Sequence, residues 1–114
     1  MHILFVHPNF PAQFGHVADL LTRQRGWRCT FVSEKPAGRV NRIELVQFTR
    51  KGGATERSHY CSRTFENAIW NAHAVFESLK GRNDIRPDLV VGHSGFGSTL
   101  FLRELYDCPI VNYF

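Results

Sequence analysis

Five short apolar runs are spaced along the sequence. They occupy residues 3–6, 29–32, 43–48, 89–91 and 110–113, and turn-forming residues or helix-like segments separate them. Continuous apolar runs of this length, rich in Val, Ile and Phe, are typical of strands that are buried on both faces of a sheet. The runs therefore predict a largely parallel sheet that is covered on both sides.

Helical periodicity fills two of the gaps between these runs and, more weakly, a third. The apolar positions that repeat at helical spacing are Phe14, Val17, Ala18 and Leu21, then Phe65, Ile69, Ala72, Phe76 and Leu79, and finally Leu102, Leu105 and Tyr106. Gly26 and Gly81 follow the first two segments and are expected to cap them. With right-handed crossovers, this order predicts one α/β domain over residues 1–114, a Rossmann-like three-layer sandwich around a mostly parallel sheet of about five strands.

Composition excludes several classes of protein. The chain has 114 residues, a formal net charge of +4 and 43% hydrophobic residues, which fits one globular domain. No apolar run approaches the ~18 residues of a membrane span, and the N-terminus has no secretory pattern. The three cysteines are too few and too far apart for a disulfide framework, so we expect a reduced, cytoplasmic protein. The 14 basic residues are scattered and match no nucleic-acid-binding module, so no nucleic-acid partner is expected.

Polar residues follow the first apolar run. Ligands of open parallel sheets bind beyond the carboxyl ends of the strands, and residues 7–16 occupy such a place. His7, Asn9, Gln13, Gly15 and His16 are the candidates there for holding a hydroxylated ligand. The alternative is purely structural, with Asn9 capping the helix and His16 on its surface. Because these histidines have no nearby cysteine or carboxylate in the sequence, no metal site is predicted.

A glycine-rich segment, GHSGFGST at residues 92–99, follows the fourth run. Its spacing approaches a phosphate-binding loop, but Ser98 stands where that loop needs lysine, which argues against an NTPase. Phe96 likewise breaks the nucleophile-elbow pattern around Ser94, and Leu100 breaks the dinucleotide pattern. What remains is a turn with exposed backbone N–H groups. The candidates are His93, Ser94 and Gly95 for a binding cleft, and Gly97, Ser98 and Thr99 for anion binding at a helix N-terminus. Alternatively, the glycines only permit a tight turn.

Three stretches of the sequence carry a family resemblance. They read MHILFVHPNFP at residues 1–11, RPDLVVGHSGFGS at residues 86–98 and FLRELYDCPIVNYF at residues 101–114. Together they resemble the N-terminal domain of family-4 (group 1) glycosyltransferases of the GT-B fold. Members of that family open with a strand and a PxxGG-like loop, and later show PDVVHxHG and PxVxxxH around two further strands.

The resemblance implies one half of a two-domain enzyme, often in a bacterial polysaccharide or glycolipid context. In such enzymes the C-terminal domain binds a nucleotide-sugar donor and the N-terminal domain shapes the acceptor site. Transfer is metal-independent and retains the anomeric configuration. Residues 8–16 correspond to the first loop, of whose glycine pair only Gly15 is present. His93 and Ser94 correspond to the stretch that lines the acceptor cleft. The family's polar residue after the last strand falls at or beyond Phe114, so no catalytic residue is assigned.

These observations predict a chain that is truncated relative to a full GT-B N-terminal domain and inactive alone, with no cofactor of its own. Its expected partners are a C-terminal donor-binding domain and a sugar or lipid-linked acceptor. The sequence also permits peripheral membrane contact and self-association of the truncated chain through an exposed strand. The alternative is a free-standing Rossmann-like or flavodoxin-like module that binds a phosphorylated ligand without catalysis. A third interpretation, a serine hydrolase, is supported by Ser94 alone.

Overall fold

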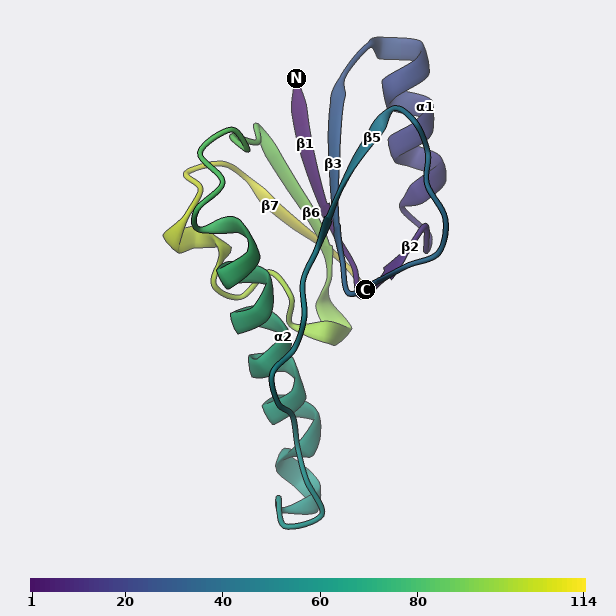
Figure 1. Ribbon diagram of the computed structural model, residues 1–114. Helices are drawn as coiled ribbons and strands as arrows, with labels where there is room; N and C mark the ends of the chain where they lie inside the picture. The colour runs from purple at the N-terminus through teal and green to yellow at the C-terminus, as the bar shows by residue number, and fades with distance from the viewer.

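The centre of the molecule is a five-stranded parallel sheet. The computed structural model describes all residues from Met1 to Phe114. The strands are β1 (His2–Val6), β3 (Arg28–Ser33), β5 (Ile43–Gln47), β6 (Leu89–His93) and β7 (Ile110–Tyr113). They lie in the order β5-β3-β1-β6-β7, so β1 is central and β5 and β7 are the edges (Figure 1). The five strands and their parallel arrangement confirm the sequence prediction.

Two helices cover opposite faces of the sheet and complete a three-layer sandwich. Helix α1 (Gly15–Arg25) lies on one side and helix α2 (Arg63–Leu79) on the other (Figure 1). Gly26 caps α1 in the left-handed conformation, with φ of 64°, as predicted. Gly81 does not cap α2 in this way. The capping residue is Lys80 in a right-handed conformation, and Gly81 has no positive φ.

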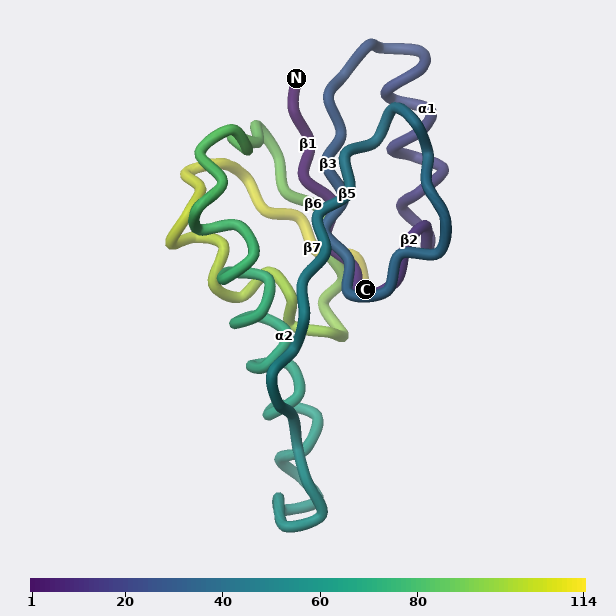
Figure 2. The backbone as a smooth tube through the Cα atoms, in the orientation of Figure 1, coloured from purple at the N-terminus to yellow at the C-terminus, as the bar shows by residue number.

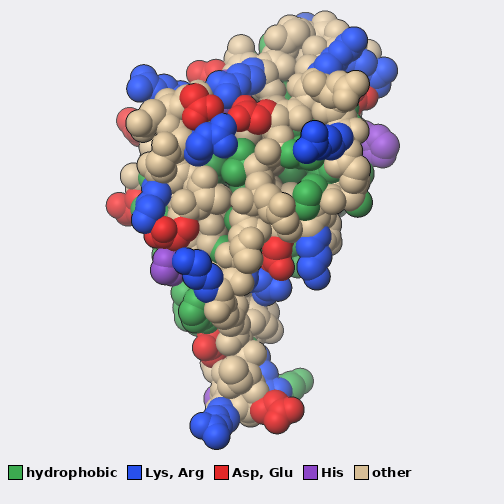
Figure 3. Space-filling view, viewed as in Figure 1, with side chains coloured by type: hydrophobic (Ala, Val, Ile, Leu, Met, Phe, Trp, Pro, Cys, Tyr) green, Lys and Arg blue, Asp and Glu red, His purple; other side chains and the backbone are tan.

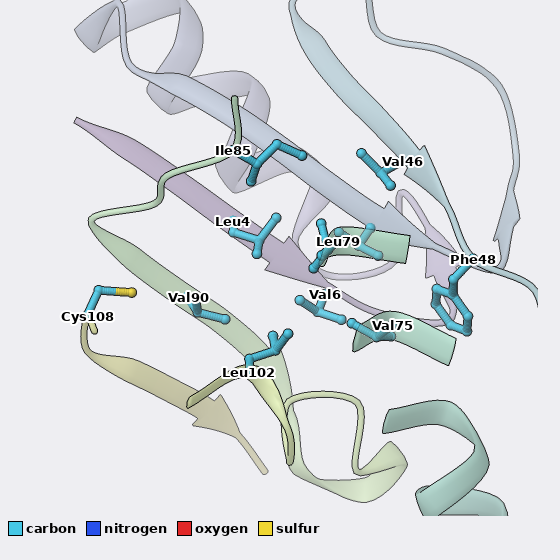
Figure 4. Packing of buried hydrophobic residues seen from close by; sticks show 11 residues of the cluster. Leu4, Val6, Val46, Phe48, Val75, Leu79, Ile85, Val90, Leu102 and Cys108 are labelled. Carbon is cyan, nitrogen blue, oxygen red and sulfur yellow. The ribbon is translucent and has the colours of Figure 1, made fainter. Parts of the chain in front are cut away.

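Alternation along the strands divides the core in two. Leu4 and Val6 of β1 face α2 and join an 11-residue cluster with Val75 and Leu79 (Figure 4). Ile3 and Phe5 face α1 and join a second cluster of 8 buried residues. Because neighbouring side chains of a strand point to opposite faces, one central strand stabilises both layers.

The helix predicted around residues 102–106 is wrong. Two short 3-10 helices, η2 (Ser94–Phe96) and η3 (Leu102–Glu104), occupy the connection between β6 and β7. Gly97 adopts a left-handed conformation with φ of 65°, which interrupts any continuous helix from Ser94. Leu102 is nevertheless buried beneath α2, so its apolar character reflects core packing without an α-helix.

Two features were not predicted. A minor parallel sheet joins β2 (Asn9–Phe10) to β4 (Lys35–Pro36) beside α1. The segment between β5 and α2, which includes the 3-10 helix η1 (Tyr60–Ser62), runs alongside the first half of α2 far beyond the sheet (Figure 2). No helix in the structure has the length and apolar composition needed to cross a membrane.

An ionic network fastens the amino end of the sheet. Glu44 of β5 accepts hydrogen bonds from Arg28 of β3, at 2.8 Å, and from Arg82 in the α2–β6 connection. Arg82 also pairs with Asp84 at 2.9 Å. Acidic and basic side chains gather in alternation at this upper end of the molecule (Figure 3). Partial burial raises the pKa of Glu44, but the hydrogen bonds and charges of both arginines outweigh it and lower the pKa overall.

The network makes stability depend on pH. A carboxyl group with a lowered pKa in the folded chain binds protons more readily when unfolded, so its contribution is lost as pH falls below about 4.5. We expect Glu44→Gln to be less stable than the parent near neutral pH and to lose less stability on acidification. Urea unfolding at a series of pH values measures both effects. Glu104→Gln, at an exposed carboxylate without an ion pair, is the control and should keep the parent's pH dependence.

Gly92 lets the β6–β7 connection approach the sheet closely. A Cβ atom at this position would lie 2.3 Å from Cγ2 of Thr99 and 3.1 Å from Oδ1 of Asn112. Thr99 in turn donates a hydrogen bond of 2.8 Å to that same Asn112 oxygen. Because Gly92 has no side chain, the connection can pack closely enough for Thr99 to bond to Asn112 of β7.

Adding a methyl group at Gly92 should overpack this contact. We expect Gly92→Ala to lower the free energy of unfolding by about 1–3 kcal/mol. Thr99→Ser removes the clashing methyl group and keeps the hydroxyl, so the double variant should recover much of the loss. Chemical denaturation of the four chains gives the coupling energy. Gly81→Ala, where nothing lies within 4 Å of the added atom, is the matched control. Equal losses in the presence and absence of the Thr99 methyl group would contradict the assigned clash.

Candidate functional site

Polar and aromatic residues lie at the carboxyl ends of three adjacent strands, β1, β6 and β7. His7 directly follows β1, His93 ends β6 and Tyr113 ends β7. The register pairs Val6 with Gly92 and His93 with Tyr113. The three side chains therefore meet at the carboxyl edge of the sheet, where open parallel sheets bind their ligands.

The rings at this edge form one cluster, the aromatic site, which consists of His7, Phe14, His93, Phe96 and Tyr113. His7 is its centre, with ring centroids 5.8 Å from His93, 5.1 Å from Phe96 and 6.1 Å from Phe14. Tyr113 lies 5.6 Å from His93 and 6.4 Å from Phe14. These contacts are edge-to-face, a geometry that aromatic pairs prefer.

The two histidines share a local hydrogen-bonding arrangement. The backbone N–H of Gly95 donates to Nδ1 of His93 at 3.1 Å, whereas Nδ1 of His7 lies 3.0 Å from both the N–H and the carbonyl oxygen of Asn9 and can accept from the one or donate to the other. A neutral imidazole that accepts at Nδ1 carries its proton on Nε2. In this form His93 offers an N–H donor to a ligand oxygen.

Burial favours the neutral form of His7, whose side chain is 6% exposed. Desolvation is the largest effect and lowers its pKa, a hydrogen bond with the backbone of Asn9 raises the pKa by a smaller amount, and the nearby His93 lowers it by less still. His7 is therefore a buried member of the aromatic site, and His93 is half-buried.

The turn after β6 is fixed by contacts from two directions. Ser94 donates from Oγ to the backbone oxygen of Tyr113 at 3.2 Å. Asn71 of α2 donates to the backbone oxygen of Phe96 at 3.2 Å. Because the Ser94 hydroxyl is bonded to a carbonyl and not to a histidine, the geometry offers no support for a serine nucleophile.

Gly97, Ser98 and Thr99 do not lie at the start of an α-helix. They form a turn that leads to η3, and a 3-10 helix of three residues supplies little of the dipole that attracts anions. The Ser98 side chain is buried, and its hydroxyl has no partner. Thr99 is buried and bonded to Asn112. The expected helix N-terminus is therefore wrong, and anion binding by these residues stays an untested prediction.

The first predicted loop divides into buried and exposed residues. Gly15 is buried as the first residue of α1, where an added Cβ would lie 2.2 Å from a Pro11 side-chain atom. Asn9, Gln13 and His16 are exposed. Asn9 does not cap the helix, because Phe14 precedes α1 and no side chain caps it. The structure thus joins His7 and His93 in one site, while Gln13 and His16 form no hydrogen bond with either.

Phe14, Phe96 and Tyr113 are site residues that sequence reasoning missed. Phe14 belongs to the apolar stripe of α1, Phe96 served only as a mismatch to a motif, and Tyr113 lies in an apolar strand. Position at a strand end was the available signal for Tyr113, since that criterion had already selected His7 and His93. No group of three or more His, Cys, Asp or Glu side chains could hold a metal ion.

The solved structures that share this fold include two glycosyltransferases. The crystal structure of CalG4, the calicheamicin glycosyltransferase, matches with a TM-score of 0.59 and 20% identity over 97% of this chain. A UGT transferase from Siraitia grosvenorii, solved in complex with UDP, matches with a TM-score of 0.57 and 14% identity over 99% of this chain. The chain spans 31% and 27% of their lengths. At such identity the likeness establishes the fold.

Sequence comparison supplies the family. No curated protein sequence matches the chain significantly. The family model described as "Glycosyl transferase family 4 group" matches residues 25–114, which include every strand of the main sheet except β1. The fold, the strand-end site and this match agree with the predicted N-terminal GT-B domain, and the chain belongs to the glycosyl transferase family 4 group.

Proposed function

We propose that this chain forms the acceptor side of a glycosyltransferase that moves a sugar from a nucleotide-sugar donor to an acceptor hydroxyl. The observation that carries the proposal is the aromatic site at the carboxyl edge of the sheet, in a chain of a glycosyltransferase family. The chain spans less than a third of the solved glycosyltransferases that it resembles. We therefore propose that a separate donor-binding domain completes the cleft.

The chemistry of the site suits a sugar acceptor. A pyranose presents hydroxyl groups at its edge and C–H bonds on its faces. Nε2–H of His93 can donate to an acceptor oxygen, and the rings of Phe96 and Tyr113 can cover an apolar sugar face. The contact between Ser94 and Tyr113 holds the rim in place before the ligand arrives.

In the proposed reaction, the bond between the donor's anomeric carbon and the nucleotide phosphate breaks, and the acceptor oxygen bonds to that carbon. The proton of the acceptor hydroxyl passes to the departing nucleotide phosphate, which leaves with the electron pair of the broken bond. Retention of configuration follows from the resemblance to family-4 enzymes. Within this chain, the residues of the aromatic site orient the acceptor, since His93 accepts from Gly95 at Nδ1 and can donate from Nε2. The three free cysteines favour a cytoplasmic setting.

The alternative, a non-catalytic module for a phosphorylated ligand, has weaker support. It depends on backbone N–H groups at an α-helix N-terminus, and none follows Gly97. The aromatic site contains no Lys or Arg side chain that could pair with a phosphate.

The purified 114-residue chain should show no sugar transfer. The aromatic site would supply one side of the cleft, while donor binding resides in the proposed second domain. Incubation with UDP-glucose and a glucoside acceptor, followed by mass spectrometry, measures turnover. Isothermal titration with UDP-glucose should likewise show little binding. Measurable transfer, or tight and specific nucleotide binding by this chain, would contradict the proposal that a separate domain binds the donor.

Loss of the His93 donor should weaken acceptor binding selectively. We expect His93→Phe, which keeps an aromatic ring and removes the N–H, to raise the Kd for methyl glucoside about 3- to 10-fold, as one lost hydrogen bond would. Chemical-shift titration of the labelled chain measures Kd and shows whether the aromatic site moves. His16→Phe, at an exposed histidine outside the cluster, is the matched control. Shifts that spare the aromatic site would refute its assignment as the acceptor site.

A further inference from the structure

The turn that follows β6, residues 94–97, fixes the orientation of two rings of the aromatic site. The N–H of Gly95 donates to Nδ1 of His93 at 3.1 Å, and a Cβ atom at Gly95 would lie 3.2 Å from that ring. Phe96 belongs to the turn itself, and its ring centroid lies 5.1 Å from those of both His7 and His93. A displacement of the turn would therefore change the positions of the His93 and Phe96 rings together.

Asn71 of α2 holds the end of this turn. Its Nδ2 donates to the backbone oxygen of Phe96 at 3.2 Å, between residues that are 25 positions apart. No backbone N–H donates to that oxygen, because the 3-10 helix η2 ends at Phe96. Asn71 is 6% exposed, so solvent does not compete strongly for its amide. The orientation of the Phe96 carbonyl thus depends on one buried side chain of α2.

A second contact on α2 keeps the turn close to the helix. Gly97 has φ of 65°, and a Cβ atom there would lie 2.7 Å from Cβ of Ala68 and 3.2 Å from its backbone oxygen. Ala68 and Asn71 are three positions apart, so they share one face in the middle of α2. The turn after β6 approaches this part of the helix (Figure 1). Steric contact sets the distance between turn and helix, and the hydrogen bond sets the orientation.

The amide of Asn71 has a cost that an apolar side chain would not have. Its Oδ1 is buried and has no hydrogen-bond partner. A buried acceptor without a partner is unfavourable, and a leucine of similar size would avoid that cost while leaving the Phe96 oxygen unbonded. Other buried positions of the helix, Ala72, Val75 and Leu79, are apolar. The direction of its hydrogen bond to Phe96 therefore accounts for this amide better than its packing in the core does.

We propose that Asn71 is a positioning residue of the aromatic site. Its amide holds the turn so that the Gly95 N–H stays on Nδ1 of His93, which keeps the proton of that ring on Nε2. The same bond holds the Phe96 ring beside His7 and His93. Only the use of this Nε2–H for an acceptor hydroxyl rests on the proposed function. The coupling between α2 and the two rings stands without it.

Asn71→Leu, which keeps the approximate volume and removes the donor, tests the coupling in the 114-residue chain. We expect the amides of Gly95 and Gly97 to exchange with solvent about 3- to 10-fold faster, as the loss of one hydrogen bond would allow. The nitrogen chemical shifts of the His93 ring distinguish its two tautomers. They should move from the Nε2–H form toward a mixture, because Nδ1 no longer has a fixed donor.

Asn67→Leu is the matched control on the same helix. Oδ1 of Asn67 accepts from the backbone N–H of Ala54 at 2.9 Å, in the segment that precedes η1. This variant should speed the exchange of the Ala54 amide and leave Gly95, Gly97 and the His93 tautomer as in the parent. A general loosening of α2 would instead change the turn in both variants.

Titration with methyl glucoside separates this proposal from the proposed function. If the parent binds it at the aromatic site, Asn71→Leu should raise the Kd about 3- to 10-fold and Asn67→Leu should leave it unchanged. If the parent does not bind it, the acceptor assignment fails. Amide exchange and the His93 tautomer then still decide whether Asn71 positions the rings.

Three results would overturn the proposal. They are parent-like exchange and tautomer in Asn71→Leu, the same changes in Asn67→Leu, or a parent-like Kd in a variant whose His93 tautomer has shifted. Should Asn71→Leu fail to fold, Asn71→Ala with Asn67→Ala as its control gives the same readouts, because alanine also removes the donor and is a good helix former.

Discussion

The burial of β1 between two parallel neighbours determines where both helices pack and where the site forms. All five of its residues are buried, and it pairs with β3 on one edge and β6 on the other. Its alternate side chains enter the two core clusters, so neither helix could dock without it. The same strand sets His7 at the carboxyl edge, where its neighbour β6 delivers His93. Stability and site geometry thus have a common origin in one apolar segment.

The strands could be predicted because each apolar run indicates a strand by itself, but the run of β7 wrongly predicts burial on both faces, since its residues are half-buried or exposed. A run such as residues 3–6 contains enough apolar side chains to show that both faces are covered, without knowledge of its neighbours. The third helix failed because Leu102, Leu105 and Tyr106 have helical spacing for another reason. They pack in and around the core from 3-10 turns after a left-handed Gly97, whose conformation the spacing does not reveal. The minor sheet of β2 and β4 escaped because two residues carry no periodicity.

The site could be predicted only in part, because its members meet through the sheet and not along the chain. His7 and His93 were found by a positional rule, that polar residues just after parallel strands share one edge. Phe14 and Tyr113 lie 99 positions apart, and their ring centroids are 6.4 Å apart only because of strand order and register. Either residue alone is indistinguishable from core. Phe14 directly precedes helix α1, and its helical spacing with the apolar residues of α1 predicts a packing role only.

The composition of the aromatic site limits what it can contribute to the proposed transfer. A departing nucleotide carries negative charge that develops as the glycosidic bond breaks, and stabilising that charge requires cations or aligned N–H dipoles. The aromatic site contains two imidazoles and three other rings, and burial favours the uncharged form of its central histidine. The nearby turn ends in a 3-10 helix without a substantial dipole. Its residues can therefore hold an acceptor and fix the direction of its hydroxyl, whereas stabilisation of the leaving group must come from charges outside this cluster.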